Sequence, residues 1–143
     1  MKKPGSTCDY TQAKNDELVK AFYAYVGRTV MIDLDAIFRQ IADSPASRFF
    51  ISEERAYELV RRYRSSGKWD MANPLRVAML DQIHSNAMGL MASDARLTLK
   101  DAVYEAVNSP APKFYLTPKS CRQLIYKTIK ERNLALRMAR LGL

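Results

Sequence analysis

The sequence predicts a mainly α-helical fold, a single domain of about six helices over residues 1–143. Apolar residues recur every three or four positions in several segments, which is the period of an amphipathic helix. Capping residues, two of them followed by proline, mark where these segments begin. Part of the chain is also repeated, because residues 44–52 (SPASRFFIS) and 109–117 (SPAPKFYLT) are identical or chemically similar except for Ser47 against Pro112.

The first third of the chain is expected to hold a disordered tail and two helices. Residues 1–8 form the tail, and a helix follows from about residue 11 to 26, closed by Gly27. We interpret its aromatic residues as core, with a base-stacking surface as the alternative: Tyr10, Phe22, Tyr23 and Tyr25. Residues 30–32 form a linker or a single turn. Asp33 then caps a helix that ends near residue 42, before Pro45.

The rest of the chain contains four further predicted helices. Their N-caps are Ser52, Asn73, Thr98 and Thr117. The first of these helices ends at Gly67, and the second runs to about residue 92. The third ends at residues 108–110, where a proline follows. The fourth passes Asn133 and is expected to continue as a frayed extension.

The repeat extends beyond the nearly identical segments. Residues 33–67 and 98–133 each read as helix, extended segment, helix, which predicts two units packed about a pseudo-twofold axis. Pairing residues 48–51 with 113–116 as a short two-stranded antiparallel ribbon would satisfy their backbone groups. The ribbon would place four aromatic residues at the centre of the molecule, as core: Phe49, Phe50, Phe114 and Tyr115.

Composition argues against several classes of protein. Two cysteines and one histidine, His84, provide little material for a disulfide framework, a metal site or a catalytic triad, so no cofactor is predicted. Cys121 occupies the position of Ala56 in the first unit and is interpreted as a small core residue. The chain has no apolar run of membrane-spanning length and no secretory signal, so no membrane association and a cytoplasmic location are expected.

Charge provides the main functional clue. The net charge is +8, and it is concentrated in the second helix of each unit, with +4 over residues 55–68 and +7 over residues 113–143. Basic clusters of this kind favour a polyanionic partner, so the predicted function is nucleic-acid binding, with duplex DNA favoured. The candidate contact residues are Arg48, Arg55, Arg61, Arg62, Arg64, Lys113, Lys119, Arg122, Tyr126, Lys127, Lys130 and Arg132.

The alternative to nucleic-acid binding is an assembly function, and an enzyme is the third class. An assembly protein without nucleic acid would use the apolar residues of 73–92 or 134–143 to bind a protein partner or a second copy. An enzyme is not predicted, because no nucleophile–base pair or phosphate-cradling glycine loop is present. The acidic residues that suggest a Mg²⁺ site are not repeated in the second unit: Asp33, Asp35, Asp43, Glu53 and Glu54.

Overall fold

The computed structural model describes residues 7–28 and 33–142, and this part of the chain contains six α-helices. They are α1 (Thr7–Arg28), α2 (Leu34–Ala42), α3 (Glu53–Ser66), α4 (Pro74–Ser93), α5 (Leu99–Val107) and α6 (Pro118–Arg140). The prediction of a mainly α-helical fold is therefore confirmed. None of these helices is both long enough and apolar enough to cross a lipid bilayer.

All five predicted N-caps are confirmed by their hydrogen bonds. The side chains of Asp33, Ser52, Asn73, Thr98 and Thr117 each accept a bond from a backbone N–H in the first turn of the helix that follows. These bonds satisfy donors that have no partner within the helix itself. At the end of α3, Gly67 has a φ of 75°, a left-handed conformation that glycine adopts without the cost imposed by a side chain.

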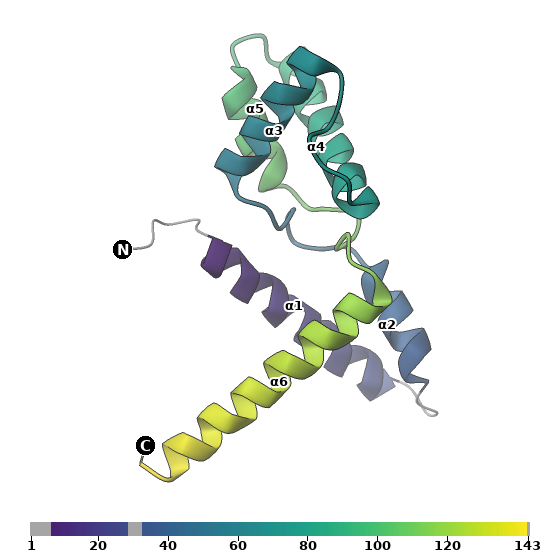
Figure 1. Ribbon diagram of the computed structural model, residues 1–143, viewed down its shortest axis with the longest axis vertical. Helices are drawn as coiled ribbons and strands as arrows, with labels where there is room; N and C mark the ends of the chain where they lie inside the picture. Colours follow the sequence, from purple (N-terminus) through teal and green to yellow (C-terminus); the bar gives the residue numbers. More distant parts are fainter. Residues whose placement is uncertain (1–6, 29–32, 143) are drawn as a thin grey trace.

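The helices pack in two groups of three (Figure 1). One group contains α3, α4 and α5, and the other contains α1, α2 and α6. Helices α2 and α3 are consecutive in the chain but belong to different groups, and so do α5 and α6. The connections 43–52 and 108–117 therefore cross from one group to the other, and we call them the crossing segments.

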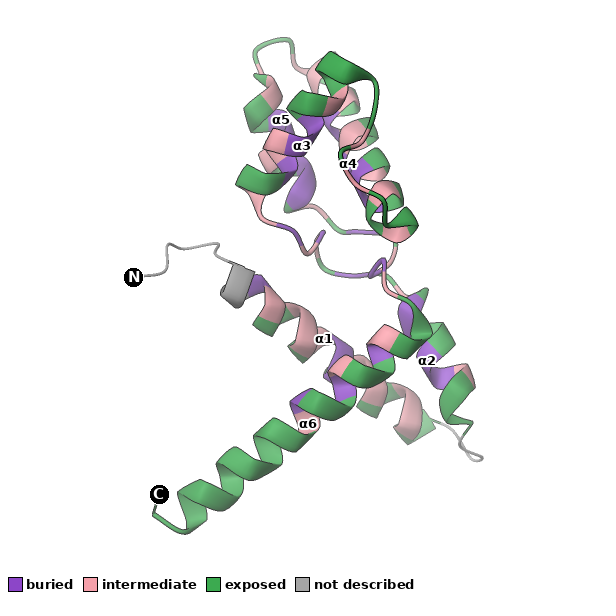
Figure 2. Ribbon diagram, viewed as in Figure 1, coloured by how far each residue is buried: buried purple, intermediate pink, exposed green. Residues whose placement is uncertain are grey.

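One buried core runs through both groups and the crossing segments (Figure 2). Leu18, Ile41 and Ile125 are fully buried in the group of α1, α2 and α6, as are Leu59 and Val103 in the other group. The aromatic residues of the crossing segments join the two parts: Phe49, Phe114 and Tyr115 are buried and Phe50 is half-buried. The prediction that these residues lie in the core is confirmed for the three buried ones, and Phe50 packs against the core.

The crossing segments touch through one pair of backbone hydrogen bonds. Ala46 and Ala111 each donate an N–H to the other's carbonyl oxygen at 3.0 Å, which forms a single antiparallel bridge. Beside it, the ring of Phe49 stacks on Tyr115, and that of Phe50 stacks on Phe114, each pair with centroids 6.0 Å apart.

The predicted ribbon between residues 48–51 and 113–116 does not form, and the described residues contain no strand. Other groups satisfy this backbone. The N–H of Phe49 donates to the carbonyl of Val107 at 3.0 Å, and the Arg48 guanidinium donates to the carbonyls of Phe49 and Ile51 at 2.9 Å. Tyr115 has a φ of 59°, which is incompatible with an extended strand.

Two further expectations differ from the structure. Helix α1 already includes residues 7–8 of the predicted tail, whereas residues 1–6 and the linker 30–32 lie outside the described residues. Tyr23 is 57% exposed, because it points away from the stripe that buries Leu18 and Val19. The expected continuation of the last helix past Asn133 is confirmed, since α6 runs to Arg140.

We predict that Phe49→Ala lowers the free energy of unfolding by about 3–5 kcal/mol, because it leaves a cavity where the two groups meet. Urea denaturation monitored by circular dichroism measures this change. Tyr23→Ala removes an exposed ring and is expected to cost about 0.5 kcal/mol. Equal losses for both variants would contradict the central position of Phe49.

Candidate nucleic-acid interface

Helix α6 carries most of the charge of the molecule. It contains seven basic residues and one acidic residue, a net charge of +6, whereas α3 contains four basic and three acidic residues. Only the first half of α6 contributes buried residues, namely Cys121, Ile125 and Thr128. Residues 130–142 are all exposed, and Figure 2 shows this half of α6 extending beyond the helices that cover its beginning.

One face of α6 presents a continuous row of polar and basic side chains, which we call the α6 stripe. Successive members are three or four positions apart and therefore lie on the same side of the helix. They are Lys119, Arg122, Tyr126, Lys130, Asn133, Arg137 and Arg140, and all seven are exposed. Glu131, the only acidic residue of α6, lies on another face. At 1.5 Å per residue, the stripe is about 32 Å long.

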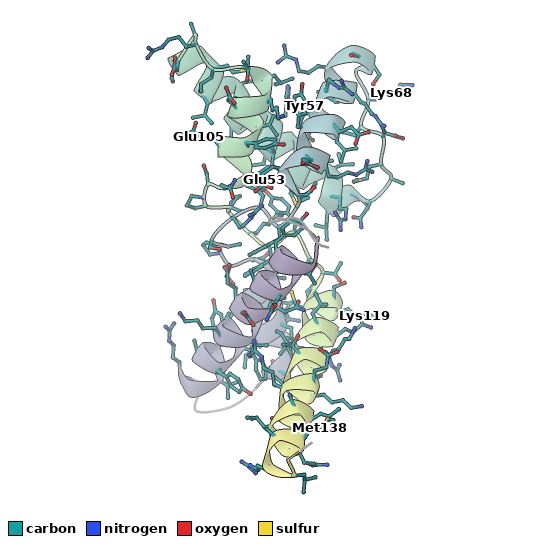
Figure 3. All side chains as sticks on the ribbon, turned by 90° about the vertical axis from the view of Figure 1, so that its left-hand side faces the viewer. Glu53, Tyr57, Lys68, Glu105, Lys119 and Met138 are labelled. Carbon is teal, nitrogen blue, oxygen red and sulfur yellow. The ribbon has the colours of Figure 1, made fainter. Side chains whose placement is uncertain are left out.

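Aromatic contacts hold the beginning of the stripe in place. The ring of Tyr126 meets Phe22 and Phe38 edge-on, with centroids 6.2 Å and 5.6 Å apart. The guanidinium of Arg122 lies over the ring of Tyr126, 5.7 Å from its centroid. Helices α1 and α2 thus fix the orientation of the stripe. Lys119 and Met138 mark the two ends of α6 in Figure 3.

The basic residues of α3 lie in the other group of helices and are partly neutralised. Glu58 pairs with both Arg55 and Arg62, and Arg62 also pairs with Asp70 at 3.2 Å. Arg61 lies over the ring of Tyr57 at 6.0 Å, and Arg64 donates to the sulfur of Met88 at 3.2 Å. Helices α3 and α6 also belong to different groups, so the two basic helices do not pack against each other as one pair.

Three other candidate residues make contacts within the protein. Arg48 bonds the crossing segment, pairs with Glu53 at 3.6 Å and lies over the ring of Tyr10. Lys113 is half-buried over Tyr115, and Arg132 pairs with Asp16 of α1. Of the candidates on α6, Lys127 is exposed on the face next to the stripe.

Several residues of the α6 stripe and near its beginning were not predicted as contacts from the sequence. The predicted contact residues end at Arg132 and leave out Asn133, Arg137 and Arg140. The sequence spacing does place Arg137 on the same face as Lys119, Arg122 and Lys130, and Asn133 and Arg140 continue that spacing. Lys14 of α1 and Arg76 of α4 were also missed. They are far apart in sequence and lie together only in the folded chain, so no local signal identifies them.

The acidic residues, cysteine and histidine that could support metal binding or catalysis lie in structural positions. Asp33 is the N-cap of α2, and Glu53 accepts a hydrogen bond from Asn108 at 3.2 Å. Within the described residues, no three histidine, cysteine or acidic side chains come close enough to hold a metal ion. Burial raises the pKa of the Cys121 thiol to about 11, against the opposite effect of Lys14. His84 is half-buried beside Tyr63 and Trp69.

Comparison with known proteins adds no relative, since no family model, curated protein or solved structure matched this chain.

We predict that Arg48→Met destabilises the protein by about 1.5–3 kcal/mol, because it removes charged hydrogen bonds to two carbonyls. Urea denaturation tests this expectation, with the exposed Arg61→Met as the control at about 0.5 kcal/mol or less. If both variants unfold at the same urea concentration, Arg48 does not brace the crossing segment.

Proposed function

We propose that this protein binds nucleic acid, most favourably duplex DNA, in the cytoplasm, and that the α6 stripe is the contact surface. One observation carries the proposal: α6 presents five exposed cations in a single row of fixed orientation, with no acidic residue in that row. Salt bridges neutralise isolated surface cations in many proteins, as Glu58 does on α3. Within the described residues, no salt bridge involves a member of the stripe.

The dimensions of α6 suit a duplex. An α-helix fits the major groove of B-DNA, which is about 12 Å wide. The stripe length of about 32 Å is close to one turn of the duplex, about 34 Å. Along this distance the duplex carries one phosphate charge per about 1.7 Å, so a row of cations meets a dense row of anions.

The members of the stripe have different proposed roles. Lys119, Arg122, Lys130, Arg137 and Arg140 contact phosphates, which fixes the position of the protein on the duplex without reading its sequence. Asn133 is the candidate for a base contact, because an asparagine amide forms two hydrogen bonds with adenine in the major groove. Tyr126, which is itself exposed, supports the Arg122 guanidinium over its ring.

We further propose that the two sequence units are related by a pseudo-twofold axis through the bridge between Ala46 and Ala111. These two alanines occupy the same position in the repeated segments. The aromatic stacks support the axis. A twofold rotation would exchange Phe49 with Phe114 and Phe50 with Tyr115, so it would bring the stack of Phe49 and Tyr115 onto the stack of Phe114 and Phe50. On this proposal α3 and α6 are equivalent helices, and α6 is the one specialised by length and charge for nucleic acid.

We predict that three changes on the stripe, Lys130→Gln, Arg137→Gln and Arg140→Gln in one variant, weaken binding to a labelled 30-mer duplex by more than tenfold at low salt. Each phosphate contact contributes about 0.9 to the slope of log affinity against log salt concentration. We therefore expect the slope to fall by about 3 in this variant. Fluorescence anisotropy at several salt concentrations measures both quantities.

The control variant removes the same charge from the other group of helices, through Arg61→Gln, Arg64→Gln and Lys68→Gln. All six changed residues are exposed, so both variants are expected to remain folded. The control should retain most of the affinity and the slope of the unchanged protein. Equal losses in both variants would indicate general charge attraction and would contradict an interface on α6.

The second candidate function is assembly through the far end of α6. Leu134, Met138 and Leu141 lie on one side of this helix and are 42–67% exposed, an arrangement typical of a contact face. Residues of α4, the other candidate surface, are less accessible, because Met79 is buried and Met88 and Met91 pack against the core.

For the assembly function, we predict that the unchanged protein sediments as a dimer at about 100 μM, because weakly associating proteins form complexes at concentrations of this order. A variant with Leu134→Gln, Met138→Gln and Leu141→Gln should sediment as a monomer. A monomeric unchanged protein would remove this candidate.

A further inference from the structure

Two neighbouring cavities lie where α1, α4 and the crossing segments meet, and their linings share Lys14, Phe50 and Arg76. The first, of about 210 Å³, reaches Thr117 and Ser120 at the beginning of α6. The second, of about 410 Å³, reaches Ser52, the N-cap of α3, and Arg55 in its first turn. We call the two together the junction groove. Cavities of this size hold small ligands or parts of larger ones.

The junction groove is lined by three cations, of which Arg55 pairs with Glu58 outside the lining, whereas Lys14 and Arg76 have no acidic partner among the described residues. Lys14, Arg55 and Arg76 contribute to its walls, and no aspartate or glutamate does. Within the described residues, Lys14 and Arg76 form neither an ion pair nor a side-chain hydrogen bond. Two neighbouring cations without an anion repel each other, so an unoccupied groove costs stability.

The state of Lys14 reflects this lack of a partner. Burial lowers its pKa, and the positive charge of Arg76 lowers it further, against a smaller opposite effect of Cys121. An anion that approaches a lysine in such a position stabilises its charged form, because the anion both neutralises the repulsion and replaces the lost hydration.

The helix ends beside the groove also favour an anion. Asn73 and Thr117, the N-caps of α4 and α6, line its first cavity. The N-terminal end of a helix carries a partial positive charge, and neither helix has an acidic residue in its first turn to offset it. Lysine, arginine and helix ends therefore contribute charge of the same sign to one small volume.

A separate hollow provides a comparison, because acidic residues lie near its cations. It lies at the end of α3, measures about 760 Å³, and is lined by Arg61, Arg62 and Lys68 together with Trp69. Asp70 lines it as well and pairs with Arg62, and the indole N–H of Trp69 donates to Asp81 at 2.6 Å. Its charges are thus partly matched by acidic residues of the protein, unlike Lys14 and Arg76 of the junction groove.

We propose that the junction groove binds a phosphate group between the Lys14 ammonium and the Arg76 guanidinium. The guanidinium provides a planar pair of donors that matches two phosphate oxygens, and the ammonium provides a point charge. The aromatic walls at Phe50 and Tyr10 contact the organic group attached to the phosphate. This site does not depend on nucleic-acid binding by α6. The phosphate belongs either to a small molecule or to a nucleic-acid backbone that continues past Lys119.

The first test uses inorganic phosphate as the probe and the full chain. Binding is followed by heteronuclear NMR and by the thermal unfolding midpoint, with chloride at matched ionic strength as the reference. We expect phosphate to shift the amide signals around Lys14 and Arg76 and to raise the midpoint. Arg76→Gln and Lys14→Met should each weaken phosphate binding at least tenfold, whereas the exposed Lys20→Met and Arg96→Gln should not. A response to phosphate no larger than that to chloride would overturn the proposal.

The same variants separate a ligand site from a structural role. Without phosphate, Lys14→Met should unfold at a temperature no lower than that of the unchanged protein, because it removes a charge that is repelled in the unoccupied groove. A lower midpoint together with unchanged phosphate affinity would assign Lys14 to packing and overturn the proposal. Arg76 is exposed on α4, so Arg76→Gln tests the site even if Lys14→Met destabilises the protein.

The source of the phosphate is identified by titrating the same variants with the 30-mer duplex. If Arg76→Gln weakens both phosphate and duplex binding, the groove holds a backbone phosphate. If it weakens phosphate binding alone, the ligand is a small phosphorylated molecule. Loss of duplex binding on changing the α6 stripe, with phosphate affinity intact, would separate the two sites.

Discussion

The crossing of two chain segments is the contact on which the rest of this structure depends. Ala46 and Ala111 bond to each other through their backbones, and the rings beside them stack in two pairs. Helices α3, α4 and α5 follow one another in the chain, whereas α6 returns to α1 and α2 only through the second crossing segment. The group of α1, α2 and α6 is therefore closed across the crossing, and the packing at Phe49 and Tyr115 joins it to the other group. The small side chains of the alanines allow the backbones to approach closely.

The same arrangement explains why charge is presented on α6 rather than on α3. The first half of α6 packs against α1 and α2, which fixes its direction, whereas its second half extends past them and is exposed along its whole length. Helix α3 is shorter, and two of its four arginines, Arg55 and Arg62, pair with acidic residues. The crossing also brings α1 and α4 to the beginning of α6, where Lys14 and Arg76 form the junction groove. The proposed duplex surface and the proposed phosphate site are therefore adjacent but use different residues.

Local features of the structure could be predicted from the sequence, and non-local ones could not. Ser52 and Thr117 indicate where helices begin, because an N-cap depends only on the next few residues. The aromatic residues of the repeated segments were expected in the core, and three of the four are buried. The pairing of these segments was predicted wrongly, because Arg48 and Val107 satisfy backbone groups that a ribbon would have used. Proximity of Lys14 to Arg76 depends on tertiary packing, which no local pattern encodes.

Backbone NMR of the labelled protein during titration with a 16-base-pair duplex at low salt is the most direct test of the central claim, that the α6 stripe is the nucleic-acid surface. We expect the largest amide shifts at Lys130, Asn133 and Arg137, with smaller shifts at the beginning of α6 and none along the exposed residues of α3. The helix is continuous, so these signals should move together with a single affinity. Shifts confined to α3 and the hollow at its end, or no shifts at low salt, would contradict the claim.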